Sequence, residues 1–136
     1  MRFQANVSSD GYLVEYYDEK YDLISTKLVE KELPSFGAFY ASEDNYYLLT
    51  GKTNYDESNS VEVYRITKYD KNWKRISSCG LYGANTSGPF EAGSARIAEA
   101  GRYLLIHTCH EMYKSSDGYN HQANVTIQVD TQTMKV

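Results

Sequence analysis

The feature of this sequence that most limits its fold is a weak internal repetition at intervals of roughly 50 to 60 residues. Residues 17–25 (YDEKYDLIS) align with residues 69–77 (YDKNWKRIS), and more faintly with residues 129–136 (VDTQTMKV). A second pair relates residues 37–49 to residues 93–105, and both members end in Tyr-Leu-Leu. A period of this length indicates a repeated supersecondary unit.

Apolar and β-branched residues alternate in short runs separated by turn residues, which predicts strands. Residues 26–33 have a helix-like composition, but this segment is too short to stand alone and Pro34 ends it. Asp10-Gly11 and Asp117-Gly118 predict hairpin turns. The expected strands cover residues 2–8, 11–18, 22–29, 37–42, 45–53, 61–69, 74–80, 93–98, 102–113 and 121–130.

The expected fold class is therefore all-β, and about four strands fit each period. We expect a single domain over residues 1–136 with repeats near 1–33 (partial), 36–82 and 92–136 (partial). Fourteen tyrosines and an aromatic content of 14% suit strands with one buried face.

Residues 46–54, 61–70, 72–75 and 81–83 resemble the blade repeats of secreted bacterial β-propeller proteins. In that family a Tyr-x-Leu-x-Gly-x-Thr-Asn strand, matched here by residues 47–54, precedes an apolar strand ending in Lys-x-Asp and a last strand ending in Tyr-Gly. Trp73 stands where the family has glycine, and the third repeat has a longer hairpin. The resemblance covers most of residues 11–136 and implies a scaffold that is often extracellular and often binds a ligand, with no single chemistry.

Roughly two and a half blades are expected here, whereas closed propellers have about four to eight. Three explanations are open: the chain is a piece of a longer protein, several copies close a ring as a homo-oligomer, or the strands form an unrelated β-sandwich or barrel.

Charge and composition exclude several partners. A formal net charge of −4 with scattered basic residues argues against nucleic acid. Apolar runs stay below the roughly 20 residues of a membrane span, and the first residues do not resemble a signal peptide, so secretion or cell-surface location rests on the resemblance alone. Cys79 and Cys109 are expected to be small buried thiols rather than a disulfide. We expect no cofactor.

All three histidines lie in residues 107–124, next to Cys109. If Asp117-Gly118 forms a two-residue turn, Lys114 pairs with His121, His110 with Val125 and Cys109 with Thr126. His107 then points to the opposite face from His110 and His121, so a metal site formed by the three histidines is disfavoured.

A propeller arrangement would bring loops 54–60, 81–92 and 113–121 to one rim, where binding residues commonly lie. Arg96 would face the central channel or the next blade, either pairing with Glu91 or Glu99 or binding a ligand. The candidate ligand-binding residues are Asn85, Phe90, Arg96, His107, His110, Tyr119, Asn120 and His121.

Two functions are compatible with these residues. The first is a noncatalytic recognition module for a glycan or a protein, in which Asn85, Phe90 and residues 119–121 form the contact surface. The second is an enzyme that acts on an anionic sulfate or phosphate ester through Arg96, His107 and His110. The second needs both histidines on one side of their strand, which the alternation of a strand opposes.

Overall fold

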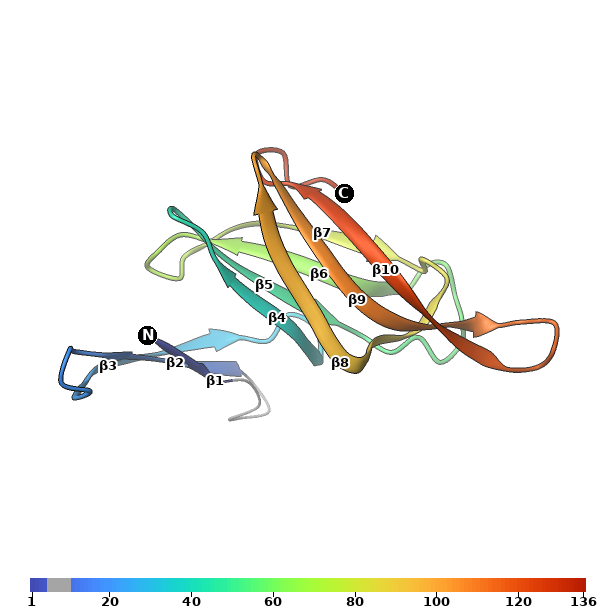
Figure 1. Cartoon of the computed structure of the whole chain (residues 1–136), viewed down its shortest axis with the longest axis horizontal. Helices are drawn as coiled ribbons and strands as arrows, with labels where there is room; N and C mark the ends of the chain where they lie inside the picture. Colours follow the sequence, from blue (N-terminus) through green and yellow to red (C-terminus); the bar gives the residue numbers. More distant parts are fainter. Residues whose placement is uncertain (5–10) are drawn as a thin grey trace. The chain divides into compact units, whose positions relative to one another are not determined.

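A computed structural model of the chain describes residues 1–4 and 11–136 (Figure 1). Over these residues it contains ten antiparallel strands and no helix, which confirms the predicted all-β class. Residue Asp10 of the predicted first hairpin turn, and the end of the strand predicted over 2–8, lie outside the described residues. The strands are β1 (Arg2–Gln4), β2 (Gly11–Tyr17), β3 (Leu23–Glu30), β4 (Ser35–Ala41), β5 (Tyr46–Gly51), β6 (Glu62–Tyr69), β7 (Arg75–Tyr82), β8 (Thr86–Ala100), β9 (Tyr103–Lys114) and β10 (Asn120–Asp130).

The chain divides into two compact units, Met1–Glu32 and Leu33–Val136. The first unit is a three-stranded sheet in the order β1-β2-β3. Within it the Phe3 and Tyr12 rings lie 5.4 Å apart, and Arg2 forms an ion pair with Glu15 at 3.7 Å. The helix-like segment after Thr26 continues β3 as far as Glu30, because pairing with β2 outweighs the weak helical preference of so short a run.

The second unit consists of a four-stranded sheet, β4-β5-β6-β7, and a three-stranded sheet, β8-β9-β10, each a meander of neighbouring strands. Figure 1 shows the second sheet lying across the first, and their facing side chains form one core. The core follows the period-two alternation of the strands, since every second residue points inward. Its buried members are Ala38, Tyr47, Leu49, Val63, Tyr64, Ile66, Ala95, Leu104, Ile106, Ile127, Val129 and Met134.

The aligned Tyr-Asp segments occupy like places in the fold. Asp18 begins the turn between β2 and β3, and Asp70 begins the turn between β6 and β7. In the first turn the Asp18 carboxylate accepts the N–H of Lys20 at 2.8 Å and of Asp22 at 2.9 Å.

The second turn repeats these contacts. The Asp70 carboxylate accepts the N–H of Asn72 at 2.8 Å and of Lys74 at 2.9 Å. In both turns the residue three after the aspartate has positive φ, 66° at Tyr21 and 62° at Trp73. The two segments are thus the same local structure.

Asp130 starts a related turn after β10 that is one residue longer. Its carboxylate accepts the N–H of Gln132 at 2.9 Å, Met134 has a φ of 48°, and the chain closes through a bridge between Asp130 and Lys135. An aspartate turn thus follows one strand in each of the three sheets, namely β2, β6 and β10.

Two expectations about loops are wrong. The connection predicted over residues 81–92 is short, because β8 begins at Thr86 and continues through three irregularities in its pairing with β9. Positive φ at Phe90, Ala92 and Gly93 produces this irregular backbone, which keeps hydrogen bonding to β9.

The hairpin β9–β10 also differs from the predicted register. His110 pairs with Ala123 and Cys109 with Asn124, each two positions from the expected partner, and Lys114 pairs with Asn120, one position from the expected His121. The turn is wider than a two-residue turn, because Ser115 N–H donates to the Tyr119 carbonyl at 2.9 Å, and a bulge follows Asn120. Beyond this bulge the shift is two positions, and an even shift leaves the side chains from Gln122 onward on their expected faces.

Candidate recognition surface

One end of the second unit gathers three connections, those between β5 and β6, β7 and β8, and β9 and β10. Hydrogen bonds between these connections hold them together at this end, which we call the rim. Asn54 is 1% exposed, and its amide nitrogen lies 3.2 Å from the Thr86 carbonyl and 3.0 Å from the Tyr113 hydroxyl. Its amide oxygen accepts the Ser58 N–H at 3.0 Å. Asn54 therefore links the connections by hydrogen bonds.

Glu57 and Asn120 form a second link, between the β5–β6 connection and the β9–β10 hairpin. The Glu57 carboxylate accepts the Asn120 amide at 2.7 Å and the Lys114 N–H at 2.9 Å. These two donors lower the pKa of Glu57 below its ordinary value, because they stabilise the charged form. Asn120 also donates to the Met112 carbonyl at 2.7 Å. Its amide is thus engaged within the protein, so Asn120 positions the rim.

Asn85 behaves similarly. It has a φ of 48°, and its side-chain oxygen accepts the Tyr113 N–H at 3.3 Å. Asparagine tolerates this left-handed backbone better than most residues do, because its short side chain bonds locally. Asn85 holds the β7–β8 connection against the base of the β9–β10 hairpin.

Three tyrosines project from this rim. Tyr55 is 90% exposed, Tyr119 70% and Tyr82 60%. We call Tyr55, Tyr82 and Tyr119 the rim tyrosines. Only Tyr119 is among the residues singled out from the sequence. Tyr55 could have been found by its position directly after Asn54 in a polar loop, where a large aromatic side chain has no strand to pack on.

The tip of the β9–β10 hairpin contains a compact polar group. His121 Nε2 lies 2.6 Å from the Asp117 carboxylate, and both side chains are about half exposed, at 51% and 50%. The Ser115 hydroxyl, the Tyr119 N–H at 3.0 Å and His121 lower the pKa of Asp117 to about 2. His121 thus helps to hold the turn that presents Tyr119.

Phe90 does not lie in a rim loop. Its ring packs edge-on against Tyr64 at 5.4 Å and covers Gly37 and Gly51, where a Cβ would come within 2.5 Å of it. Those two glycines leave space for the ring. Phe90 therefore fills a gap between the two sheets, which corrects the expectation that it presents surface to a ligand from a loop.

His110 is buried, with 6% of its surface exposed, and its Nδ1 lies 2.7 Å from the Thr86 hydroxyl. Burial lowers its pKa, because the protonated ring would lose hydration. His110 is positioned to hold β8 against β9 in the core.

His107 is exposed on the opposite face of the same sheet, 3.1 Å from the Thr126 hydroxyl. Arg96 is its direct neighbour across the β8–β9 pair and donates to the Ala95 carbonyl at 3.0 Å. Within the described residues, Arg96 forms no ion pair with Glu91 or Glu99, which bond instead to Gln122 and Tyr40. The structure thus brings Arg96 and His107 together and separates both from His110.

Metal ligands do not cluster. Over residues 1–4 and 11–136 no three His, Cys, Asp or Glu side chains come close enough to share an ion. Cys79 and Cys109 are free and half-buried, and burial raises the pKa of the Cys79 thiol to about 11. None of the described residues belongs to a helix that could cross a bilayer.

Comparisons with family models, with curated proteins and with solved structures give no match to this chain.

Proposed function

We propose that this chain is a noncatalytic recognition module of a secreted or cell-surface bacterial β-propeller protein, and that the rim of its second unit binds a glycan or a protein. In this proposal each sheet is a propeller blade or part of one. The recurrence of the Asp turn at the same place in the β1–β3 and β4–β7 sheets favours blades over a β-sandwich, in which the strands need not repeat.

The observation that carries the proposal is the pairing of exposed aromatic rings with a rigid base. The rim tyrosines stand on connections that Asn54, Glu57 and Asn120 hold through buried or half-buried hydrogen bonds. Tyrosine supplies a large amphipathic contact surface with few rotatable bonds, and a rim that is already ordered loses little entropy on binding.

The chemistry of the rim suits neutral polar ligands. A sugar ring offers C–H faces to an aromatic side chain and hydroxyls to amides and hydroxyls, and a protein surface offers similar groups. Two acidic groups at the rim are occupied by structural bonds, Glu57 with Asn120 and Asp117 with His121.

The test is binding of the intact chain to a glycan array and to candidate surface proteins, compared with Tyr119→Ala and Tyr55→Ala. Each variant is expected to weaken binding about tenfold, as loss of one stacked aromatic contact would. Tyr21→Ala is the matched control, because Tyr21 is 86% exposed but belongs to the first unit. Binding that both rim variants leave unchanged would refute the proposal.

A second candidate function rests on the adjacency of Arg96 and His107 on an exposed sheet face. A guanidinium beside an imidazole could bind the anionic group of a sulfate or phosphate ester and assist its transfer or hydrolysis. Hydrolysis of nitrophenyl sulfate or phosphate that disappears in both Arg96→Gln and His107→Ala would support it. Activity that persists in either variant would count against it.

A further inference from the structure

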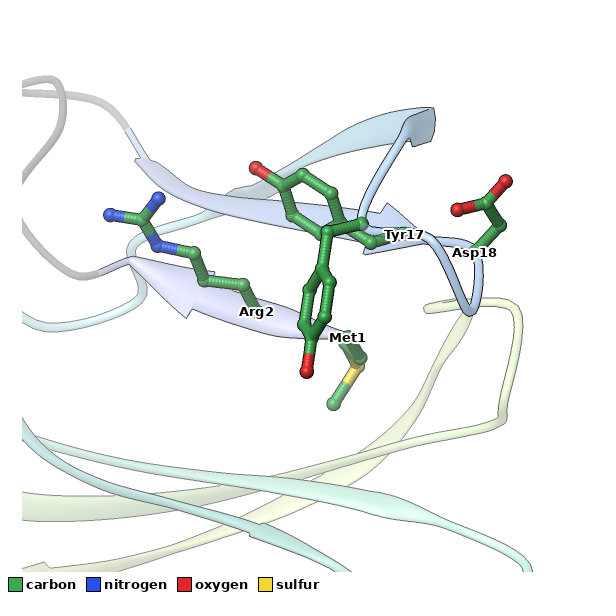
Figure 2. Close-up of a pocket in the computed structure, with 5 residues that line it drawn as sticks. Met1, Arg2, Tyr17 and Asp18 are labelled. Carbon is green, nitrogen blue, oxygen red and sulfur yellow. The ribbon is translucent and has the colours of Figure 1, made fainter.

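The two units each contain a cavity, and the cavities differ in whether their charged groups are paired. In the first unit a cavity of about 450 Å³ is lined in part by Arg2, Tyr17 and Asp18. Figure 2 shows Arg2 and Tyr17 on neighbouring strands, with Asp18 at the turn beyond them. Arg2 forms an ion pair with Glu15, and the Asp18 carboxylate accepts two backbone N–H groups. The charged groups of this cavity therefore already have partners in the protein.

The second unit contains a polar cavity of about 240 Å³ at the end opposite the rim. Both of its sheets contribute to the lining, which includes Asp44 of the β4–β5 turn, Tyr47 of β5, Lys68 of β6, Glu99 of β8 and Thr131 after β10. Sites for drug-sized ligands have volumes of about 300–1,000 Å³, so this cavity suits a smaller molecule.

The strand register keeps the basic and acidic groups of this cavity apart. Tyr40, Tyr47 and Lys68 lie side by side on β4, β5 and β6. Because neighbouring strands are about 4.8 Å apart, the first and last of these residues are separated by roughly 10 Å. Glu99 lies at the β4 side, where its Oε2 is 3.4 Å from the Tyr40 hydroxyl. Lys68 Nζ donates instead to the Thr131 carbonyl at 2.8 Å, so Tyr47 stands between the two charges.

These charged groups are not paired with one another. Within residues 1–4 and 11–136, Lys68, Glu99 and Asp44 take part in no ion pair. Tyr47 is 2% exposed, and burial together with the negative charges of Glu99 and Asp44 raises the pKa of its hydroxyl. Both carboxylates therefore lie close enough to act on this hydroxyl. Among the described residues no three acidic, histidine or cysteine side chains are placed to share a metal ion.

The β4–β5 turn that carries Asp44 is already ordered. Ser42 N–H donates to the Asn45 carbonyl at 2.9 Å, and the Asn45 amide donates to the Tyr69 carbonyl at 3.1 Å. Lys71 also donates to the Ser42 carbonyl. A site with ordered walls loses little entropy when a ligand binds.

The unpaired charges determine which ligand suits the cavity. A neutral molecule that covers Lys68 and Glu99 would remove water from both charges without pairing them, which is unfavourable. A simple anion would meet the carboxylates, and a simple cation would meet the lysine. An α-amino acid separates its ammonium nitrogen from its carboxylate oxygens by about 3 Å, and a charge-assisted hydrogen bond of about 2.8 Å at each end extends this to roughly 8–9 Å. This span is comparable with the separation of β4 and β6.

We propose that the cavity between Lys68, Tyr47 and Glu99 binds a small free α-amino acid through its zwitterionic group. The ligand carboxylate accepts from Lys68 Nζ, and the ligand ammonium donates to the carboxylates of Glu99 and Asp44. The Cα and a short side chain lie on Tyr47. Pairs between partly exposed charges are weak, so the Kd should be on the order of 1 mM.

The test titrates the intact chain with alanine, propylamine, propionate and glucose, followed by amide NMR shifts at neutral pH and constant ionic strength. Propylamine and propionate each lack one of the two charges of alanine, and glucose lacks both. We expect saturable binding of alanine with shifts at Asp44, Tyr47 and Lys68. The other three molecules should bind at least about tenfold more weakly, since each loses a charge-assisted hydrogen bond.

Lys68→Met and Glu99→Gln should each weaken alanine binding about tenfold. Lys68→Met should not weaken propylamine binding, because it removes a cation that repels the ammonium group, and general damage to the fold would weaken both. Glu99 is exposed, so Glu99→Gln tests the site even if Lys68→Met does not fold. Lys74→Met is the matched control, because it removes the same charge at the same end of the unit from a residue outside the lining.

Tyr119→Ala at the rim should leave alanine binding unchanged, so failure here and failure of rim recognition are separate results. Absence of alanine binding at about 50 mM, well above the expected Kd, would overturn the proposal. Propylamine, propionate or glucose that binds as tightly as alanine would also overturn it. So would alanine binding that neither Lys68→Met nor Glu99→Gln weakens.

Discussion

The β2–β3 turn and the β6–β7 turn have the same backbone and opposite surroundings. Each begins with an aspartate that accepts two backbone N–H groups, and each places an aromatic residue at positive φ. Tyr21 is 86% exposed, whereas Trp73 is 6% exposed and contacts three other rings. The turn is therefore encoded locally, and the role of its aromatic residue depends on the neighbouring strands.

At Trp73 the energetic cost of a left-handed backbone competes with the gain from burying the side chain. A non-glycine residue in the left-handed region costs about 1–2 kcal/mol. Burial of a tryptophan contributes more, because truncation of such residues typically costs about 3–5 kcal/mol. The stack with Phe39, Tyr46 and Tyr69 accordingly outweighs the backbone cost.

The largest expected effect that tests this comparison comes from truncating the two aromatic residues. Trp73→Ala should lower the free energy of unfolding by about 3–5 kcal/mol, because it leaves a cavity among three rings. Tyr21→Ala should change it by about 0.5 kcal/mol or less. Urea denaturation measures both free energies. Unfolding is followed by far-UV circular dichroism and not by tryptophan fluorescence, because Trp73 is the single tryptophan. Equal losses of unfolding free energy in the two variants would contradict the difference between Tyr21 and Trp73.

Removal of the two aspartates tests the feature that the two turns share. Asp18→Ala and Asp70→Ala should each cost about 1 kcal/mol, the typical value for losing a side-chain cap on backbone N–H groups. The two losses should be similar, because the hydrogen bonds agree within the pair. Thermal unfolding measures the loss of stability in Asp70→Ala. Amide exchange over β2 and β3 measures the loss in Asp18→Ala. The corresponding asparagine variants serve as controls and should retain most of the stability.

Replacing Tyr21 or Trp73 by glycine should change the free energy of unfolding in opposite directions. Tyr21→Gly should stabilise the first unit by up to about 1 kcal/mol, because it relieves the positive φ without removing a buried contact. Trp73→Gly should still destabilise the second unit, since the lost stack exceeds the relief. Amide exchange and urea denaturation provide the measurements. A stabilising Trp73→Gly would show that backbone strain, and not packing, governs that turn.

The smallest expected effect concerns the Asp117 turn at the tip of β9–β10, where Tyr119 is exposed. The pKa of Asp117 is lowered to about 2 from an ordinary value of 3.8. A lowered pKa means that the carboxylate supports the turn above about pH 4 and that this support is lost as the pH falls from about 4 to about 2. The amide shifts of Ser115 and Tyr119 should report this step. Asp117→Asn should lack it, and opening between pH 7 and pH 5 would contradict the assignment.

The sequence was sufficient for most of the strands and for the repeated turn, because both depend on local patterns such as alternation and the Tyr-Asp pair, but it missed the start of β8 at Thr86. It was also sufficient to place His107 and His110 on opposite faces of their strand, which follows from their odd spacing. The pairing of β9 with β10 was wrong by two positions, since Ser115 and Tyr119 close a wider turn than Asp117-Gly118 suggests. The place of Phe90 depended on space left by Gly37 and Gly51, which lie far away in sequence.

The proposed repeat depends most on the recurrence of the Asp turn after β2, β6 and β10. The direct measurement is the backbone φ of Tyr21, Trp73 and Met134 in solution, from NMR couplings, intraresidue NOEs and residual dipolar couplings. The account predicts positive φ at all three, with protected amides at Asp22 and Lys74, which donate to Asp18 and Asp70. Negative φ at any of the three, or unprotected amides in one turn and not the other, would contradict it.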